Sequence, residues 1–329
     1  MSENRIVLKP DDIIPATEDQ KQQLDVMRKG TTYWKDAWRR LKQNKVAMAA
    51  MFMLIFIILL AIIAPIVSPY TYDQQIRADA RQGPSAKHWM GTDKHGRDIF
   101  VRLMIGTRVS LVIGLVSTAI VVVIGCTYGG LAAYLGGWAD TIMMRIVDLL
   151  MSIPSLLIII LISIALRAPL KSLIEQGGPM SQISRLGAGL ISIFAVFGLL
   201  YWTGMARSVR GALVSVRQQE YVLAAQAMGA SGRHIVFRHM VPNGMGTIVI
   251  ATTAQVPGAI FMESFLSFIG LGVSAPMASL GSMASSALDG FISFPHLLFF
   301  PSILLSLIIL SFNLFGDGLR DALDPRQRK

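Results

Sequence analysis

The chain has 329 residues, of which 53% are hydrophobic, and its mean hydropathy is +0.55. This composition excludes an ordinary soluble protein and predicts several membrane spans. The net charge of +10 does not indicate nucleic-acid binding, because the basic residues lie beside apolar spans rather than in a polar domain with interleaved aromatic residues. The single cysteine, Cys126, excludes a disulfide framework and a CxxC site.

Residues 1–46 are predicted to form a cytosolic tail that ends in an amphipathic helix. Most of the tail mixes acidic, basic and glutamine residues without periodicity, which is typical of a solvated segment. Within 33–45, Trp34, Trp38 and Leu41 share one helical face, and lysines and arginines crowd the rest. This pattern predicts an interfacial helix on an anionic leaflet, and a merely basic linker is the alternative.

Six apolar segments are long enough to cross a bilayer, which demands about 20 residues per helix. The first begins only after the polar tail and exceeds a signal-peptide core, so we expect it to be retained. An even number of crossings places both ends of the chain on one side of the membrane. The predicted spans are 47–68, 109–135, 141–166, 187–206, 244–271 and 296–315.

The lysines and arginines are distributed unequally between the two sides of this arrangement. The N-terminal tail, the loop at 205–243, the C-terminal tail and Arg145 together hold twenty, and the opposite side holds ten. Because basic residues accumulate in cytoplasmic loops, both termini and the 205–243 loop are predicted to be cytoplasmic.

The extracytoplasmic loop 69–108 contains a polar segment with two histidines and two aspartates, between His88 and Arg102. A metal site is one interpretation of these residues. We favour a second one, in which Gly91 and Gly96 mark turns that lead into an amphipathic helix on the membrane surface. The apolar face of that helix would hold Phe100, Leu103 and Met104.

Ionisable residues are rare inside the predicted spans. Arg145 and Asp148 lie one turn apart and are predicted to pair, and Glu263 lies near an outer end. Such residues either line a transport path or reach water at the end of a span, and both interpretations stay open. Pro154 and Pro257 interrupt spans three and five, where we expect kinks.

The cytoplasmic segment from Glu220 to Pro242 carries the densest charge between two apolar spans. At helical spacing its first part places Tyr221, Ala224, Ala225 and Met228 on one narrow apolar stripe. Gly229 is positioned to end this helix, and Ser231 to cap a second one. Pro242 follows at the return to the membrane, where a missing backbone donor costs little. A small-faced helix of this kind fits a groove of another protein, and a connecting loop folded on its own chain is the alternative.

This segment resembles the cytoplasmic coupling loop of the permease subunits of binding-protein-dependent ABC importers. Four residues match that loop: Ala224, Ala225, Gly229 and Pro242. The acidic residue usual before the alanines is Leu223 here, although Glu220 lies one turn earlier, and a later isoleucine is His239. The resemblance therefore implies the role of the loop, and not a specific contact by its glutamate.

Two further segments resemble the C-type permease subunit of oligopeptide and dipeptide importers. The outer loop has Gly-Thr-Asp at 91–93 and Gly-Arg-Asp at 96–98, with Val101 in place of the usual serine. The C-terminal segment has Gly-Asp-Gly-Leu-Arg-Asp at 316–321 and Asp-Pro-Arg at 324–326. With the six-span plan, the resemblance covers most of residues 34–326.

The resemblance implies an all-α polytopic fold of the type I ABC importer permease, with six transmembrane helices and both termini cytoplasmic. Its core would be 109–320, followed by a cytoplasmic tail at 321–329. The implied partners are a homologous permease subunit, two ATP-binding cassette ATPases and an extracytoplasmic peptide-binding protein. The implied cargo is short peptides, and the implied location is a bacterial cytoplasmic membrane. No cofactor is expected in this chain, since ATP and Mg²⁺ would be bound by the ATPases.

The sequence shows no motif for ATP hydrolysis, ion-coupled transport or catalysis within this chain. It has no Gly-Lys dipeptide and hence no phosphate-binding G-x-x-x-x-G-K-[ST] loop, so it is not expected to be an enzyme. Ion-coupled transport normally shows mid-membrane ionisable residues and inverted repeats, which are not evident. A nickel or other small-solute importer is the main alternative, and a channel or a membrane-embedded hydrolase is a remote one.

Overall fold

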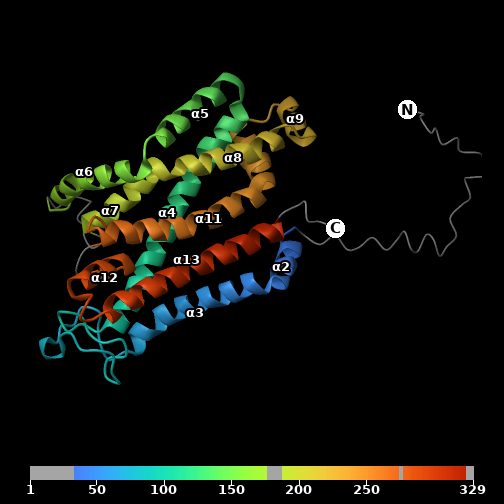
Figure 1. The fold of residues 1–329 in the computed structure, drawn as a ribbon. Coiled ribbons are helices and arrows are strands. Elements are labelled where there is room, and N and C mark those ends of the chain that lie inside the picture. The colour runs from blue at the N-terminus through green and yellow to red at the C-terminus, as the bar shows by residue number, and fades with distance from the viewer. Residues whose placement is uncertain (1–32, 176–186, 274–276, 324–329) are drawn as a thin grey trace, which may run out of the picture.

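The computed structural model describes residues 33–175, 187–273 and 277–323, and these residues are nearly all helical (Figure 1). The one β-contact among them is an isolated bridge between Thr92 and Asp98. Besides the short 3-10 turns Arg77–Asp79 and Leu288–Gly290, the helical elements are α2 (Tyr33–Gln43), α3 (Lys45–Val67), α4 (Ile99–Leu135), α5 (Gly137–Ser152), α6 (Ser155–Glu175), α7 (Gly187–Val196), the π-helix Phe197–Tyr201, α8 (Trp202–Arg217), α9 (Glu220–Ala227), α10 (Gly232–His234), the π-helix Ile235–Met240, α11 (Val241–Phe268), α12 (Leu280–Ala287) and α13 (His296–Leu323).

Six of the described helices or helix runs are long and apolar enough to cross a membrane, as the sequence predicted. Their bounds are Lys45–Val67, Ile99–Leu135, Ser155–Leu173, Gly189–Arg217, Gly232–Phe268 and His296–Leu323. In Figure 1, α2, α9 and the C-terminal end of α13 lie at one end of the bundle, whereas α12 and the loop between α3 and α4 lie at the other. This arrangement agrees with the predicted positions of the two sides.

α4 is the longest helix, and it corrects the prediction for the outer loop. Asp98 caps it by accepting a hydrogen bond from the Val101 backbone N–H at 3.0 Å. Leu103 and Met104, which were expected on a separate surface helix, are 2% and 3% exposed in the first turns of α4. The outer loop therefore ends ten residues earlier than predicted, because the capping aspartate starts the membrane helix directly.

The third span is also different from its prediction at 141–166. The backbone is extended at Ile153 (φ −89°, ψ 135°), immediately before Pro154, and this splits the segment into α5 and α6. A residue before proline is excluded from the helical region by contact with the proline ring, and proline has no N–H for the helix. The predicted kink is therefore a complete break.

Two layers of helices bury the core. In the first, α4 and α8 pack closely because α4 has glycines at 125 and 129: a Cβ at Gly129 would lie 2.3 Å from the Ala206 carbonyl oxygen. Small residues four apart let membrane helices approach in this way. The second layer is α3 against α13, which run side by side in Figure 1. α11 contacts both layers and joins them.

The ionisable groups within the spans are paired differently from the predictions. Asp148 receives a hydrogen bond from Arg207 on α8 (2.6 Å) instead of pairing with Arg145. Glu263 does not reach water in this chain, because its side chain is 0% exposed and accepts hydrogen bonds from Ser264 and Ser267. The predicted pairing with Arg145 is wrong, because sequence spacing shows neighbours on one helix and not those on the next. For Glu263, burial excludes the interpretation in which the side chain reaches water in this chain.

Candidate functional site

The predicted cytoplasmic loop 205–243 is mostly helical. α8 continues to Arg217, and the helix that enters the membrane again starts at Gly232, so only 218–231 connects the two spans. α9 occupies eight residues of this connection. The segment has the predicted form of helix, turn and helix. The connection between the two spans is shorter than the predicted loop 205–243 and is limited to 218–231.

α9 is held on the protein by one face only. Val222 and Ala225 are 0% and 3% exposed and belong to the main hydrophobic core, together with Ile235 and Val236 from the following π-helix. This corrects the predicted stripe, because Ala225 packs inward and is not available to a partner. Val222, which the sequence analysis did not single out, is the second anchor.

The opposite face of α9 presents apolar side chains to solvent. Tyr221, Leu223 and Met228 are 42%, 52% and 81% exposed, and Ala224 between them is exposed as well. Three of the predicted residues therefore share an open face, and Leu223 adds to it. Apolar side chains gathered at the tip of a connecting segment indicate a protein contact. Glu220, at the start of α9, is exposed too.

The turn after α9 is fixed by its backbone. Gly229 has φ +79°, and its N–H donates to the Gln226 carbonyl at 2.9 Å. The Ala230 N–H donates to the Ala225 carbonyl at 3.1 Å, which completes a Schellman C-cap. Ser231 then caps the next helix by accepting from the His234 N–H, as predicted. The positive φ requires glycine at 229, since a side chain would be strained there.

Exposed basic and aromatic side chains lie directly beyond this turn. Arg233, His234, Phe237 and Arg238 line a shallow hollow together with Ser231. All five are exposed, and the His234 ring lies 5.4 Å from the ring of His239. The apolar face of α9 therefore has a positively charged neighbour. From the sequence, its arginines predict only the side of the membrane on which this segment lies.

Pro242 is the second residue of α11, in a helical run that continues from the preceding π-helix. The preceding six residues, Ile235–Met240, are π-helical, and the Val241 N–H donates to the carbonyl of Val236, five residues back. A π-helical stretch of this kind changes the register of a helix and is frequent at functional sites. Pro242 therefore lies at the start of α11, as predicted, whereas the helical run that is apolar enough to cross the membrane already begins at Gly232.

The outer loop is held by side-chain pairs. The buried His88 places Nδ1 2.8 Å from Asp98, and its Nε2 lies 3.5 Å from Asp79. Lys87 donates to Asp79 at 2.6 Å, and this ion pair lowers the pKa of the Asp79 carboxyl and raises the pKa of Lys87. Among the described residues, no group of three His, Cys, Asp or Glu side chains is arranged to hold a metal ion.

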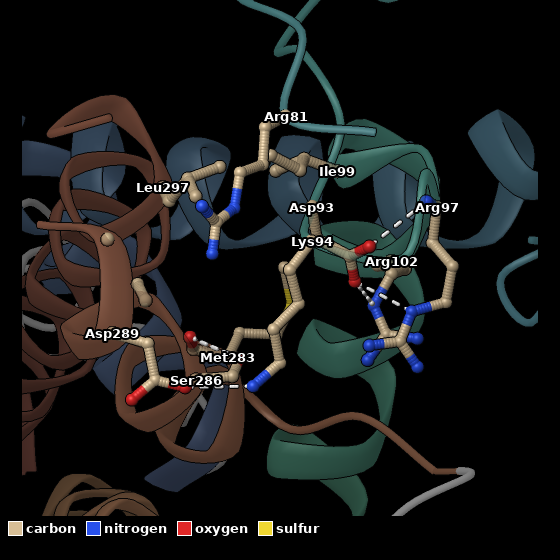
Figure 2. A pocket seen from close by; sticks show the side chains of 12 residues that line it. Arg81, Asp93, Lys94, Arg97, Ile99, Arg102, Met283, Ser286, Asp289 and Leu297 are labelled. Carbon is tan, nitrogen blue, oxygen red and sulfur yellow. Dashed lines mark hydrogen bonds and ion pairs between the residues drawn. The ribbon is translucent and has the colours of Figure 1, made fainter. Parts of the chain in front are cut away.

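A small cavity joins this loop to α12 (Figure 2). Asp93 faces Arg97 (2.6 Å) and Arg102 (3.8 Å), and Lys94 reaches Asp289 at 2.8 Å. The pair with Lys94 lowers the pKa of Asp289. The cavity volume of about 40 Å³ leaves room for water and not for a peptide or another organic solute. These ion pairs therefore hold the outer loop against the end of α12.

Comparisons with known proteins agree with this architecture. Residues 122–329 match the family described as "Binding-protein-dependent transport system inner membrane component", and residues 32–84 match the "N-terminal TM domain of oligopeptide transport permease C".

Two similar proteins come from Bacillus subtilis (strain 168). The dipeptide transport system permease protein DppC is 42% identical over 97% of this chain and 94% of its own length. The oligopeptide transport system permease protein OppC is 42% identical over 96% of this chain and 97% of its own length. The Escherichia coli (strain K12) OppC is 38% identical over 94% of this chain and 96% of its own length.

A solved structure of the MetNI methionine ABC transporter in an inward-facing conformation has the same fold. The match has a TM-score of 0.51 and 19% sequence identity, and it covers 68% of this chain and 96% of that one. Six membrane-spanning helices, the fold of an ABC importer permease and the family match over residues 122–329 lead to one conclusion: the chain belongs to the family of inner membrane components of binding-protein-dependent transport systems.

Proposed function

We propose that this chain is one of two permease subunits of an ATP-driven importer of short peptides in a bacterial cytoplasmic membrane. Its curated relatives are named for dipeptide and oligopeptide transport, and they align over nearly the whole chain. These names favour peptides over the nickel alternative. The other permease subunit is a homologous chain, and an extracytoplasmic binding protein delivers the peptide.

The observation that carries the mechanism is the two-faced α9. One face is anchored in the core by Val222 and Ala225, and the other exposes Tyr221, Leu223 and Met228. We assign the exposed face to a groove on a separate ATPase subunit, which binds ATP and Mg²⁺. Arg233 and Arg238 beside it favour an acidic rim on that groove.

The connections of α9 explain how its movement reaches the membrane. α9 is joined to α8 by two residues and to the α10–α11 run by the Gly229 turn. Because Val222 and Ala225 are packed in the same core as Met240 and Leu213, a push on α9 is transmitted to both spans. Two ATPases that close on ATP would therefore rock these spans against the partner permease and alternate access to the peptide path.

Gly229→Val tests this role. Valine at φ +79° costs about 1–2 kcal/mol in backbone strain unless the turn rearranges. No atom lies within 4 Å of its position, so the effect comes from the backbone alone. We expect normal insertion and pairing with the partner permease, with ATPase attachment weakened or ATP hydrolysis uncoupled from peptide uptake.

Gly211→Val is the matched control for this substitution. Gly211 lies on α8, is exposed, has no atom within 4 Å of its added side chain and has no positive φ. Gln226→Ala, on α9 itself, is a second control that keeps the backbone of the turn. Both controls should keep ATPase attachment, measured by co-purification, and peptide uptake in proteoliposomes. Wild-type uptake and attachment in Gly229→Val would make this segment a simple connector.

A further inference from the structure

A second cavity lies where two helical segments are irregular and a third helix, α11, passes beside them. It is bordered by the break between α5 and α6 at Pro154, by the π-helix before α8 and by the part of α11 that precedes Pro257. Its volume is about 510 Å³, within the range of small-ligand sites. The lining residues are Leu150–Ser155, Ile158, Leu200, Tyr201, Thr203, Gly204 and Gln255.

The cavity lies within the membrane. Twelve residues separate Tyr201 from Gly189 at the outer end of its span, and thirteen separate Gln255 from Phe268 at the outer end of α11. At 1.5 Å per residue these separations are about 18 and 20 Å, inside a hydrocarbon core that is about 30 Å thick. Both residues therefore lie away from the membrane surface.

The lining contains polar groups that form no hydrogen bond with the described part of the chain. In the part of the chain that the structure describes, neither the half-buried Gln255 amide nor the half-buried Tyr201 hydroxyl has a hydrogen-bond partner. The backbone is extended at Ile153, outside the regular helical pattern, and Ser155 adds an exposed hydroxyl. Such groups cannot face lipid, because each unsatisfied one costs several kcal/mol in hydrocarbon, and irregular backbone at this depth lines water or is buried in protein.

The lining contains no charged side chain. An ion pair nearby, Asp148–Arg207, has both members satisfied by each other at 2.6 Å. A neutral wall of amide, hydroxyl and backbone groups matches the groups that all peptides share, which are backbone N–H and C=O. It does not select between acidic and basic side chains.

We propose that this cavity is the wall that the chain contributes to the peptide path, and that Tyr201 and Gln255 bind the peptide backbone. The proposal rests on the peptide-importer function above and adds the contact site and its neutral chemistry. The break at Pro154 places Ile153–Ser155 in this wall, whereas a regular helix would hide its backbone groups from the cargo. Tolerance of different side chains follows from the absence of charge in this wall.

Cysteine accessibility in the assembled importer tests where the cavity opens. In a Cys126→Ala background, Gln255→Cys should react with the charged thiol reagent methanethiosulfonate ethylsulfonate in proteoliposomes, and saturating trialanine should slow the reaction at least threefold. Ala254→Cys is the matched control, because Ala254 is exposed on the same helix turn but does not line the cavity. It should not react. An unreactive Gln255→Cys would overturn the proposal, because the cavity would then face the partner permease or lipid. A reactive Gln255→Cys that trialanine does not protect would overturn it as well.

Uptake measurements test the chemistry. Gln255→Leu and Tyr201→Phe should each reduce trialanine uptake about three- to tenfold, the loss expected for one hydrogen bond. Gln255→Glu should slow an acidic tripeptide relative to a basic one, whereas the unchanged chain should handle both within about threefold. Wild-type uptake in both neutral variants would overturn the proposal and leave the peptide-importer function intact. Absence of ATP-driven trialanine uptake by the unchanged complex would instead overturn the function on which the proposal rests.

Discussion

The outer loop 68–98 and the α9 segment at the opposite end of the bundle are stabilised by different interactions. In the outer loop, the buried side chains of Asp79, His88 and Asp98 are paired: Asp79 with the exposed Lys87, and His88 with Asp98. α9 is held by two small apolar anchors and by backbone hydrogen bonds at Gly229. The outer loop therefore uses its polar groups internally, whereas α9 leaves a face open. This difference agrees with a structural role for the outer loop and supports the docking role that we propose for α9.

The largest expected effect is the opposite accessibility of the two regions. In a Cys126→Ala background, Lys94→Cys in the outer loop should react with an impermeant maleimide in intact cells. Arg233→Cys, beyond the α9 turn, should react only after permeabilisation. Both positions are exposed, so accessibility depends on the side of the membrane. Labelling of both from the same side would contradict the six-span arrangement.

A pair of neighbouring substitutions separates the two faces of α9. Ala225→Glu places a charge among buried apolar residues and should destabilise the protein by about 3 kcal/mol or more, seen as a lower melting temperature and yield. Ala224→Glu introduces the same side chain on the exposed face, and its stability should stay within about 0.5 kcal/mol of wild type. Its ATPase attachment should nevertheless be lost. Equal stabilities would show that the two faces are not distinguished by burial.

The smallest expected effect concerns the acid sensitivity of the outer loop. Because Lys87 lowers the pKa of Asp79, this carboxylate stabilises the folded state above its ordinary pKa, and the contribution is lost as the pH falls through the lowered value. Lys87, whose pKa is raised, stays charged over that range. Asp79→Asn should therefore lower the melting temperature at pH 7, and the difference from wild type should shrink toward pH 3.

Asp73→Asn, an exposed change in the same loop, is the control for this experiment. It should leave the melting temperature unchanged across the range. A difference between Asp79→Asn and wild type that is constant with pH would show that the ion pair with Lys87 does not contribute to the stability of the loop.

Several properties of this protein follow from its sequence alone. An apolar segment of about 20 residues crosses the bilayer as a helix, because only a helix forms all backbone hydrogen bonds within a single segment in hydrocarbon. The number of spans can therefore be read from each segment separately. The turn at Gly229 and the cap at Ser231 are local as well, since their hydrogen bonds join residues within one or two turns. The resemblance of residues 224–242 to the coupling loop could also be read from the sequence, because the matching residues lie close together in the chain.

Tertiary structure decided which groups meet and which stay free. Ala225 and Ala224 are equivalent in helical pattern, and only the core around Val222 and Ile235 determines that the first is buried and the second exposed. Likewise, Asp148 pairs with Arg207, which is 59 residues away in the chain. The unpartnered groups at Tyr201 and Gln255 line one cavity only because the π-helix before α8 and α11 pack beside each other. Helical periodicity orients a side chain relative to its own axis, whereas its neighbours depend on how the helices pack against each other.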